Sequence, residues 1–491
     1  MIADDTIAAI STAPGVGAIA IVRFSGPDAW TIAQKIFSPR VFSESPKSEK
    51  HWTPKSHMAT IGYIRKPDSE QYIDEVVLIA YQGPNSYTGE DLVEINCHGS
   101  PIVTREILTL ALQNGARLAQ KGEFTKRGFL SGRLDLTQAE AVLDIIHSKT
   151  ERQSHLALSA LKGHLGEEIK AVRKRLLELT TRIVAGIDFP EEVGELDLSD
   201  IEAVTDQAIE RLESLARTAR SGRYLREGLK LAIVGRPNAG KSSLLNALLN
   251  FERAIVTDVP GTTRDSIEEP VDVNGVPVIL IDTAGVRATE DAVEQIGIER
   301  TKKAIDEAEL VVFLIDGLKG IGHEEEVIAE KLLESGRSFL PVINKSDLLR
   351  GEQGAGPLPD FSGTSEDKGH ESARMKMAGA LSSPICAAAP LKISAKSGSG
   401  LDDLKGCIES WALADASLQE LGGSLNQRQG ELCHKSLDFL KALKQAAASG
   451  LPQDCLVTDL RSALGALDEL SGDSVTEEVI TEVFANFCIG K

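Results

Sequence analysis

The sequence has few aromatic residues (4%), six cysteines, and fewer basic than acidic side chains. The cysteines are scattered and form no C-x-x-C pair, so we expect a reducing compartment and neither a disulfide framework nor a cysteine-rich zinc site. No run of 18 apolar residues and no basic-then-apolar leader pattern occurs. These absences predict a soluble, cytoplasmic chain that does not enter a membrane.

The net charge is −20. Contacts with phosphates need lysine and arginine, so a chain this acidic is not expected to bind nucleic acid by itself. A role on RNA would require a local basic patch or a basic partner. The length of 491 residues suggests about three domains, and the abundance of leucine, alanine, glutamate and lysine favours helices.

A phosphate-binding loop is the most specific pattern that is present. Gly235-Arg236-Pro237-Asn238-Ala239-Gly240-Lys241-Ser242 has the form G-x-x-x-x-G-K-S. It follows an apolar run at 229–234, which predicts a strand, and precedes a helical pattern at 243–249. In this context backbone N–H groups and the helix N-terminus bind phosphates, Lys241 reaches the β- and γ-phosphates, and the Ser242 hydroxyl can hold Mg²⁺.

Three shorter patterns follow at the ends of predicted strands. Asp282-Thr283-Ala284-Gly285 can hold Mg²⁺ through a water at Asp282 and face the γ-phosphate with the Gly285 N–H. Asn344-Lys345-Ser346-Asp347 offers a carboxylate that accepts from guanine N1 and N2, a pair that adenine does not provide. In Ser394-Ala395-Lys396 the Ala395 N–H can donate to guanine O6.

These four patterns together predict a GTPase with a mixed, mostly parallel sheet, because open parallel sheets bind ligands at the carboxyl ends of their strands. The residues expected to contact GTP lie in the patterns and in the loop before the second Mg²⁺ ligand. They are Asn238, Ala239, Gly240, Lys241, Ser242, Ser243, Thr257, Asp258, Val259, Pro260, Gly261, Thr262, Thr263, Asp282, Thr283, Ala284, Gly285, Asn344, Lys345, Ser346, Asp347, Ser394, Ala395 and Lys396.

The position after Asp-Thr-Ala-Gly is Val286, so no glutamine is available there to orient the attacking water. No obvious arginine finger replaces the glutamine, although Arg264 and Arg287 are nearby candidates. A monovalent cation is one alternative, held by oxygens of Asn238, the Thr262 side chain and carbonyls around Thr257 and Val259. An ordinary switch loop with a single Mg²⁺ ligand is the other, and the residues alone do not decide between them.

The regions before and after the GTPase have different sequence patterns. Strand-like runs at 18–22, 76–81 and 91–96, with a helical stretch at 104–112, predict an α+β domain. Apolar heptad stripes at 165–183 and 201–219 predict bundle helices, which resume at 457–467, and Thr137-x-x-Glu140 suggests a capping box. The GTPase would therefore be inserted into a helical domain. The predicted boundaries are 1–130, 131–226, 227–404 and 405–491, with a surface loop at 350–384.

Several specific sequences resemble the MnmE (TrmE) family of tRNA-modifying GTPases over essentially the whole chain. They are Asp5-Thr6-Ile7, Pro14-Gly15-x-Gly17, Arg23-Phe24-Ser25-Gly26, Pro84-Asn85-Ser86-Tyr87-Thr88-Gly89-Glu90-Asp91, Lys121-Gly122-Glu123-Phe124, Ala185-Gly186-Ile187-Asp188-Phe189-Pro190 and the ending Cys488-Ile489-Gly490-Lys491. The resemblance implies an N-terminal tetrahydrofolate-binding domain that forms a homodimer, a helical domain, and an inserted Ras-like P-loop GTPase domain.

The resemblance also implies the reaction. With an FAD-dependent partner of the MnmG (GidA) family, in a heterotetramer, such proteins add an aminomethyl or carboxymethylaminomethyl group to C5 of the wobble uridine of certain tRNAs. The one-carbon unit comes from a folate, a 5-formyl or 5,10-methylene derivative of tetrahydrofolate, and FAD belongs to the partner. The acidic charge is consistent with a partner that supplies much of the RNA surface.

Individual roles follow from matching positions. Arg23, Glu94, Arg133 and Lys491 match folate contacts, although position 133 is commonly lysine in this family; without the resemblance we would interpret them as surface ion pairs. Cys488 is either a reactive thiol or a small buried residue. The metal and catalytic positions are implied in the same way: K⁺ at Asn238, Thr257, Val259 and Thr262, Mg²⁺ at Ser242 and Thr263, and catalysis by Glu294, Lys241 and Thr263, with Glu294 positioning water.

Two other functions remain open. A regulatory ribosome-assembly GTPase of the Era or EngA type has the same nucleotide patterns, but it does not account for residues 1–130 or for the Cys-Ile-Gly-Lys ending. A nucleotide-gated scaffold, in which the folate is only a stabilising ligand, is the second alternative.

Overall fold

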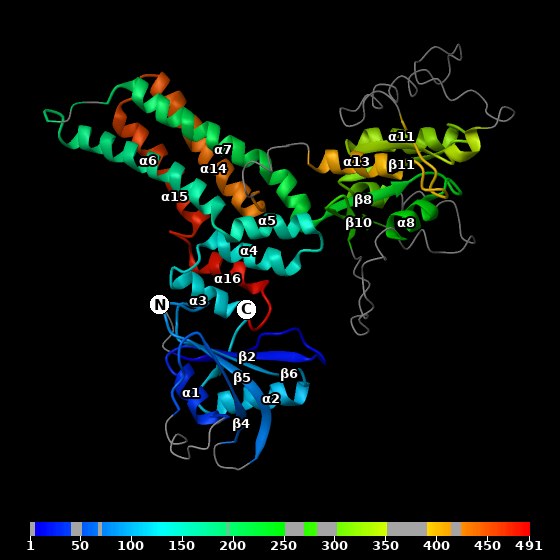
Figure 1. The fold of residues 1–491 in the computed structure, drawn as a ribbon. Helices are drawn as coiled ribbons and strands as arrows, with labels where there is room; N and C mark the ends of the chain where they lie inside the picture. The colour runs from blue at the N-terminus through cyan, green and yellow to red at the C-terminus, as the bar shows by residue number, and fades with distance from the viewer. Residues whose placement is uncertain are drawn as a thin grey trace, which may run out of the picture. The chain divides into compact units, whose positions relative to one another are not determined.

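The computed structural model describes residues 5–40, 52–66, 71–192, 194, 196–250, 270–281, 302–350, 390–413 and 424–491. The chain forms two compact units (Figure 1). Unit 1 contains Met1–Ile146, Leu158–Leu212 and Glu431–Lys491, and unit 2 contains His147–Ala157 and Glu213–Gly430. The domain boundaries predicted above stay predictions, and the predicted loop at 350–384 lies outside the described residues except for its first residue.

A seven-stranded sheet with the order β3-β4-β5-β6-β2-β1-β7 forms the N-terminal part of unit 1. Its neighbours are antiparallel except β1 and β7, which are parallel. The strands are β1 Ile7–Ile10, β2 Ile19–Ser25, β3 Phe37–Pro39, β4 Met58–Arg65, β5 Tyr72–Tyr81, β6 Leu92–His98 and β7 Arg117–Leu118. The predicted strands at 18–22, 76–81 and 91–96 are thus confirmed as β2, β5 and β6.

Alternation along the strands gives this sheet two apolar faces. On one face α1 (Ala29–Ile36) and α2 (Pro101–Gln113) pack over a core that includes Ala8 and Val22. On the other face Ile7 and Ala9 contact Phe124 of α3 (Glu123–Leu130). The single strand β1 therefore contributes to both cores, and this places α3 directly over it.

The remaining helices of the first and last parts of the chain are α4 Leu136–His147, α5 Glu151–Leu161, α6 His164–Asp188, α7 Leu198–Glu227, α14 Gln427–Ala448, α15 Gln453–Ser471 and α16 Glu477–Ala485. The predicted stripe on α6 is buried, as are Leu460 and Leu467 on α15, and these two helices pack together. The N-terminal and C-terminal helical blocks thus share a core, as predicted. No helix in the described ranges is long and apolar enough to cross a membrane.

The predicted capping box at Thr137 and Glu140 is wrong by two residues. Asp135 accepts from the Gln138 amide N–H at 3.0 Å, and Gln138 Oε1 accepts from the Asp135 N–H at 2.9 Å. Aspartate and glutamine form the same reciprocal pair as threonine and glutamate. Because Asp135 supplies the cap, Thr137 lies inside α4, where its hydroxyl donates to Asp135.

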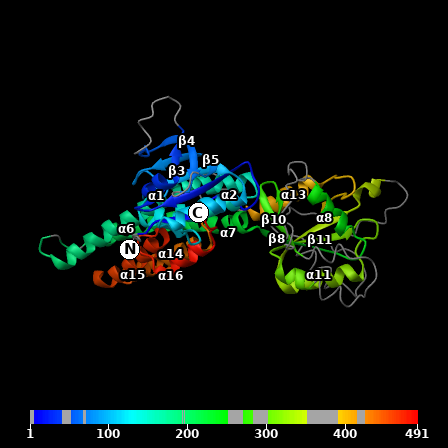
Figure 2. The same ribbon diagram turned by 90° about the horizontal axis from the view of Figure 1, so that it is seen from below.

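Unit 2 contains a six-stranded sheet with the order β13-β12-β11-β8-β10-β9, in which only the β9–β10 pair is antiparallel. The strands are β8 Leu229–Val234, β9 Val271–Val273, β10 Val276–Ile281, β11 Leu310–Asp316, β12 Ser338–Asn344 and β13 Leu391–Lys392. Helices α8 (Lys241–Asn250) and α13 (Leu401–Ala412) cover one face, and α11 (His323–Ser335) covers the other (Figure 2). The predicted mixed, mostly parallel sheet is confirmed.

Candidate functional site

The phosphate-binding loop connects β8 to α8. Gly240 has φ +99°, and a Cβ there would overlap the side-chain amide of Asn344, so only glycine fits. Lys241 Nζ donates to the carbonyls of Gly235 at 2.7 Å and Arg236 at 2.8 Å, and burial lowers the pKa of Lys241. Helix α8 begins at Lys241, and the exposed residues Ser242 and Ser243 lie in its first turn, at the helix end that favours anions.

Asn344 and Lys345 of the first guanine-reading loop contact the phosphate-binding loop, and Asn344 also joins the second guanine-reading loop. Asn344 donates through Nδ2 to the Ala239 carbonyl at 2.8 Å, and its Oδ1 accepts from the Ala395 N–H at 3.0 Å. Lys345 Nζ donates to the Asn238 carbonyl at 2.9 Å. Three separate sequence patterns therefore meet at the carboxyl ends of β8, β12 and β13, which is where sequence reasoning expected them.

The other described residues of these loops are arranged around that junction. The Ser346 N–H donates to the Ile393 carbonyl at 3.0 Å, Ser394 is buried, and Asp347 and Lys396 are exposed. The carboxylate of Asp347 is therefore accessible to a base. The predicted residues Thr257, Asp258, Val259, Pro260, Gly261, Thr262, Thr263, Asp282, Thr283, Ala284, Gly285 and Glu294 lie outside the described part of the chain.

A second group of predicted residues meets in unit 1. Arg23 on β2 and Glu94 on β6 are cross-strand partners, and Arg23 donates to Glu94 Oε1 from Nε at 3.0 Å and from Nη2 at 2.7 Å. Both side chains are largely buried. They form an ion pair with each other, as the alternative without the resemblance expected, but it is not a surface pair, because the sheet and the end of the chain enclose it.

The aromatic ring of Tyr87, which was not among the predicted site residues, lies close to both arginines of this group. The guanidinium carbons of Arg23 and Arg133 are each 5.3 Å from the centre of the Tyr87 ring, and Arg133 donates to the Tyr87 carbonyl. Phe124 adds a second ring near Arg23, and Tyr81 donates to Glu94. Tyr87 is part of one of the family-like sequences, and that was the only available signal.

The last residues of the chain complete the group, which we call the Arg23 cluster (Arg23, Tyr81, Tyr87, Glu94, Phe124, Arg133 and Lys491). Burial, followed by the charge of Arg23, lowers the pKa of the Lys491 ammonium, while Glu94 and Cys488 act in the opposite direction. Arg23 also reaches the Gly490 carbonyl. Gly490 has φ +97°, and a Cβ there would overlap the Ile10 carbonyl. Cys488 is exposed, so it is not a small buried residue.

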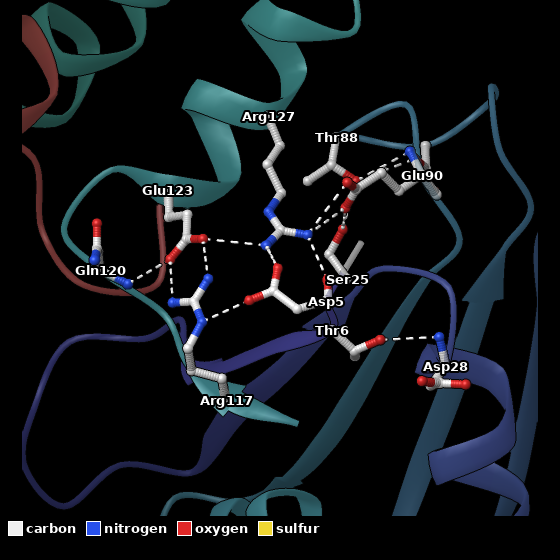
Figure 3. Close-up of polar contacts among 11 residues, drawn as sticks. Asp5, Thr6, Ser25, Asp28, Thr88, Glu90, Arg117, Gln120, Glu123 and Arg127 are labelled. Atoms are coloured by element: carbon white, nitrogen blue, oxygen red, sulfur yellow. Dashed lines mark hydrogen bonds and ion pairs between the residues drawn. The ribbon is translucent and has the colours of Figure 1, made fainter. Parts of the chain in front are cut away.

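Beside this cluster, buried ion pairs fix the start of α3 (Figure 3). Arg127, 5% exposed, contacts Asp5 Oδ1 at 2.6 Å, Glu123 Oε1 at 3.1 Å and Glu90 at 3.2 Å. Arg117 joins Asp5 and Glu123 from β7 at 2.7 and 2.6 Å. Hydrogen bonds from Arg117 and Arg127 lower the pKa of Asp5. The pKa of Glu123 is also lowered: burial acts to raise it, but the hydrogen bonds from Arg117, the Gln120 N–H and Arg127 outweigh burial.

The acidic residues Asp5, Glu90 and Glu123 of the family-like sequences at 5–7, 84–91 and 121–124 thus share one cation, Arg127. Replacement of Arg127 by methionine would remove the cation that pairs with the largely buried Glu90, and it would leave Asp5 and Glu123 with Arg117 alone. We expect Arg127→Met to lower the local stability of α3 by about 3–5 kcal/mol, measured by amide hydrogen exchange.

The matched control is Arg40→Met, because Arg40 pairs with Glu75 at 2.7 Å in the same unit but with side chains 48% and 42% exposed. Such pairs contribute about 0–1 kcal/mol. The stability that Arg127 contributes should be fully present at a pH above the ordinary carboxyl pKa. It should be lost as the pH falls through the lowered pKa values of Asp5 and Glu123. Equal losses in the two variants would contradict this assignment.

Comparisons with known proteins agree with these observations. The family model described as MnmE helical domain matches residues 136–488, and that of the GTP-binding protein TrmE N-terminus matches residues 6–133. The tRNA modification GTPase MnmE of Thermoanaerobacter sp. (strain X514) is 42% identical over 489 residues, 99% of each chain. The protein of the same name from Streptococcus pneumoniae serotype 4 is 41% identical over 491 residues, 99% of each chain.

A solved structure of Aquifex aeolicus Era has 24% identity, a TM-score of 0.26, and coverage of 44% of this chain and 66% of that one, too weak a likeness to support an argument. The family matches, together with the two sheets and the helices, confirm the predicted fold class of an N-terminal α+β domain, a helical domain and a P-loop GTPase domain. The chain therefore belongs to the MnmE (TrmE) family of GTPases.

Proposed function

We propose that this protein is the GTP-hydrolysing component of a tRNA-modifying enzyme. The reaction adds a (carboxymethyl)aminomethyl group to C5 of the wobble uridine, with a one-carbon unit from tetrahydrofolate and with an FAD-dependent partner of the MnmG family. The observation that carries this proposal is the convergence of the phosphate-binding and guanine-reading loops in a chain that matches tRNA modification GTPases over 99% of its length.

The chain's own residues supply the binding steps for GTP. Lys241 would neutralise the β- and γ-phosphates, Asp347 would accept from guanine N1 and N2, and the Ala395 N–H would turn from Asn344 Oδ1 to guanine O6. Ser242 and Thr263 would hold Mg²⁺, which draws charge from the phosphates when it is bound. We assign to Glu294 the orientation of the attacking water, because Val286 cannot perform that role.

A potassium ion is the second proposed metal. Asn238 has φ +63° and is exposed at the outer edge of the loop, and Lys345 holds its carbonyl. Amide and carbonyl oxygens suit a weakly charged cation, so Asn238 with Thr257, Val259 and Thr262 would form the site. The ion would supply the positive charge that an arginine finger provides in other GTPases.

The Arg23 cluster is the proposed folate site. Its arginines and lysine suit the carboxylates of the glutamate tail, Glu94 suits the donor edge of a pterin, and Tyr87 offers a ring on which a flat heterocycle can stack. The proposed assembly is a homodimer that joins the FAD protein in a heterotetramer and acts on tRNA in the cytoplasm. Because the net charge is −20, the partner would supply much of the RNA-binding surface.

Hydrolysis should depend on potassium. Replacement of sodium by potassium at constant ionic strength should raise the turnover of the full-length chain at least severalfold, and Asn238→Ala should remove this effect with little change in GTP affinity. Asn274→Ala is the control, because Asn274 also has a positive φ (+53°) but lies in the β9–β10 turn. Equal wild-type rates in the two salts would contradict the ion site.

The tRNA function is tested in a bacterium that lacks its own family member and expresses this chain. Mass spectrometry should find the C5 group on the wobble uridine with the wild type and not with Glu294→Gln, which should lose kcat and keep its affinity for GTP. The control is Glu307→Gln, an exposed residue paired with Lys303.

The outcomes separate the three functions. Unmodified tRNA in cells with active wild-type protein favours the ribosome-assembly alternative. A Glu294→Gln chain that no longer hydrolyses GTP but modifies tRNA fully favours the scaffold alternative.

A further inference from the structure

A network of charged side chains, with two buried carboxylates, links the phosphate-binding loop to the first guanine-reading loop. Asp316 ends β11 directly opposite Asn344 of β12, which places its carboxylate beside Lys345. The Asp316 side chain is 3% exposed, and its Oδ2 lies 2.8 Å from Lys345 Nζ. Its Oδ1 accepts from the Leu318 N–H at 3.0 Å. None of the sequence patterns described above includes Asp316.

The Lys345 ammonium has two partners on different loops. It binds Asp316 and donates to the Asn238 carbonyl at 2.9 Å. Asn238 and Lys345 both have a φ of +63°, a left-handed conformation that asparagine tolerates but that is unfavourable for lysine. A single buried carboxylate therefore reaches two loops through one ammonium, and one of these loops has a backbone conformation that is unfavourable for its lysine.

A second ion pair extends this chain toward α11. Arg236 Nε lies 3.0 Å from Glu325 Oε1, and Arg236 Nη2 lies 3.9 Å from Asp316 Oδ2. Glu325, 1% exposed, also accepts from the Gly322 N–H at the start of α11. The two cations and two carboxylates balance in charge. Removal of one of them leaves an uncompensated charge in the interior, which is costly.

We propose that Asp316 is a positioning residue that couples guanine recognition to cation activation. It fixes the position of Lys345, so that Asp347, two residues later, can accept hydrogen bonds from the base. The same ammonium fixes the Asn238 carbonyl and so positions the proposed potassium ligand. Loss of the carboxylate frees Lys345 and loosens both segments. The coupling rests on the proposed ion site, whereas the effect on base recognition does not depend on that site.

The test compares Asp316→Asn with the wild type in the full-length chain. Asparagine has the same shape and can still accept from Leu318, but it carries no charge for Lys345. We expect the preference for GDP over IDP, which lacks the N2 amino group that Asp347 reads, to fall about tenfold. The potassium concentration for half-maximal hydrolysis should rise by a similar factor.

Glu309→Gln is the matched control. Glu309 directly precedes β11 and pairs with Arg223 at the opposite end of the strand from Asp316. It should change thermal stability without changing the nucleotide preference or the potassium response. A merely structural Asp316 would behave in the same way. A GDP preference and a potassium response within twofold of the wild type in Asp316→Asn would therefore overturn the proposal.

A wild-type measurement keeps the proposal testable if Asp316→Asn does not fold. Coupling between sites is reciprocal, so half-maximal activation should need more potassium with ITP than with GTP. Equal requirements would overturn the coupling. A wild type that does not respond to potassium would overturn both the proposed ion site and the coupling. The role of Asp316 in base recognition would then be tested by the preference of Asp316→Asn for GDP over IDP alone.

Discussion

Two backbone hydrogen bonds join the end of the chain to the start of α3, and the organisation of unit 1 depends on them. The Gly122 N–H donates to the Cys488 carbonyl at 3.3 Å, and the Phe124 N–H donates to the Lys491 carbonyl at 3.2 Å. Helix starts have free N–H groups that need such acceptors. These contacts bring the end of the chain back to α3, so the last helices lie in the same unit as the first ones. The GTPase is therefore inserted between two parts of unit 1 in chain order.

Buried charge pairs perform the same task at both candidate sites. Arg127 with its three carboxylates fixes the start of α3 beside the Arg23 cluster, and Asp316 with Lys345 fixes two loops at the GTP site. Desolvation makes such pairs poor sources of net stability, but removal of one partner is costly, so they hold a geometry strongly.

The sequence was sufficient for features that depend on local pattern. The strand at 229–234, the phosphate-binding loop and the guanine-reading loops were located because spacing and strand ends determine them. It was insufficient where partners are distant in the chain: nothing local joins Asp5 to Arg127, Tyr87 to Arg133, or Asp316 to Lys345. The cap of α4 was misplaced because two adjacent segments carry equivalent capping residues. The switch-loop, Glu294 and domain-boundary assignments stay predictions.

We propose that Arg23, Glu94 and Arg133 together with the C-terminal Lys491 form one folate site, and calorimetric titration of the full-length protein with 5-formyltetrahydrofolate tests this proposal most directly. The wild type should bind, and Lys491→Gln should bind about tenfold more weakly because one charge-assisted contact is lost. Lys444→Gln, at a lysine of α14 that pairs with Asp206, should bind as the wild type does. No binding by the wild type, or equal affinities for all three proteins, would contradict the account.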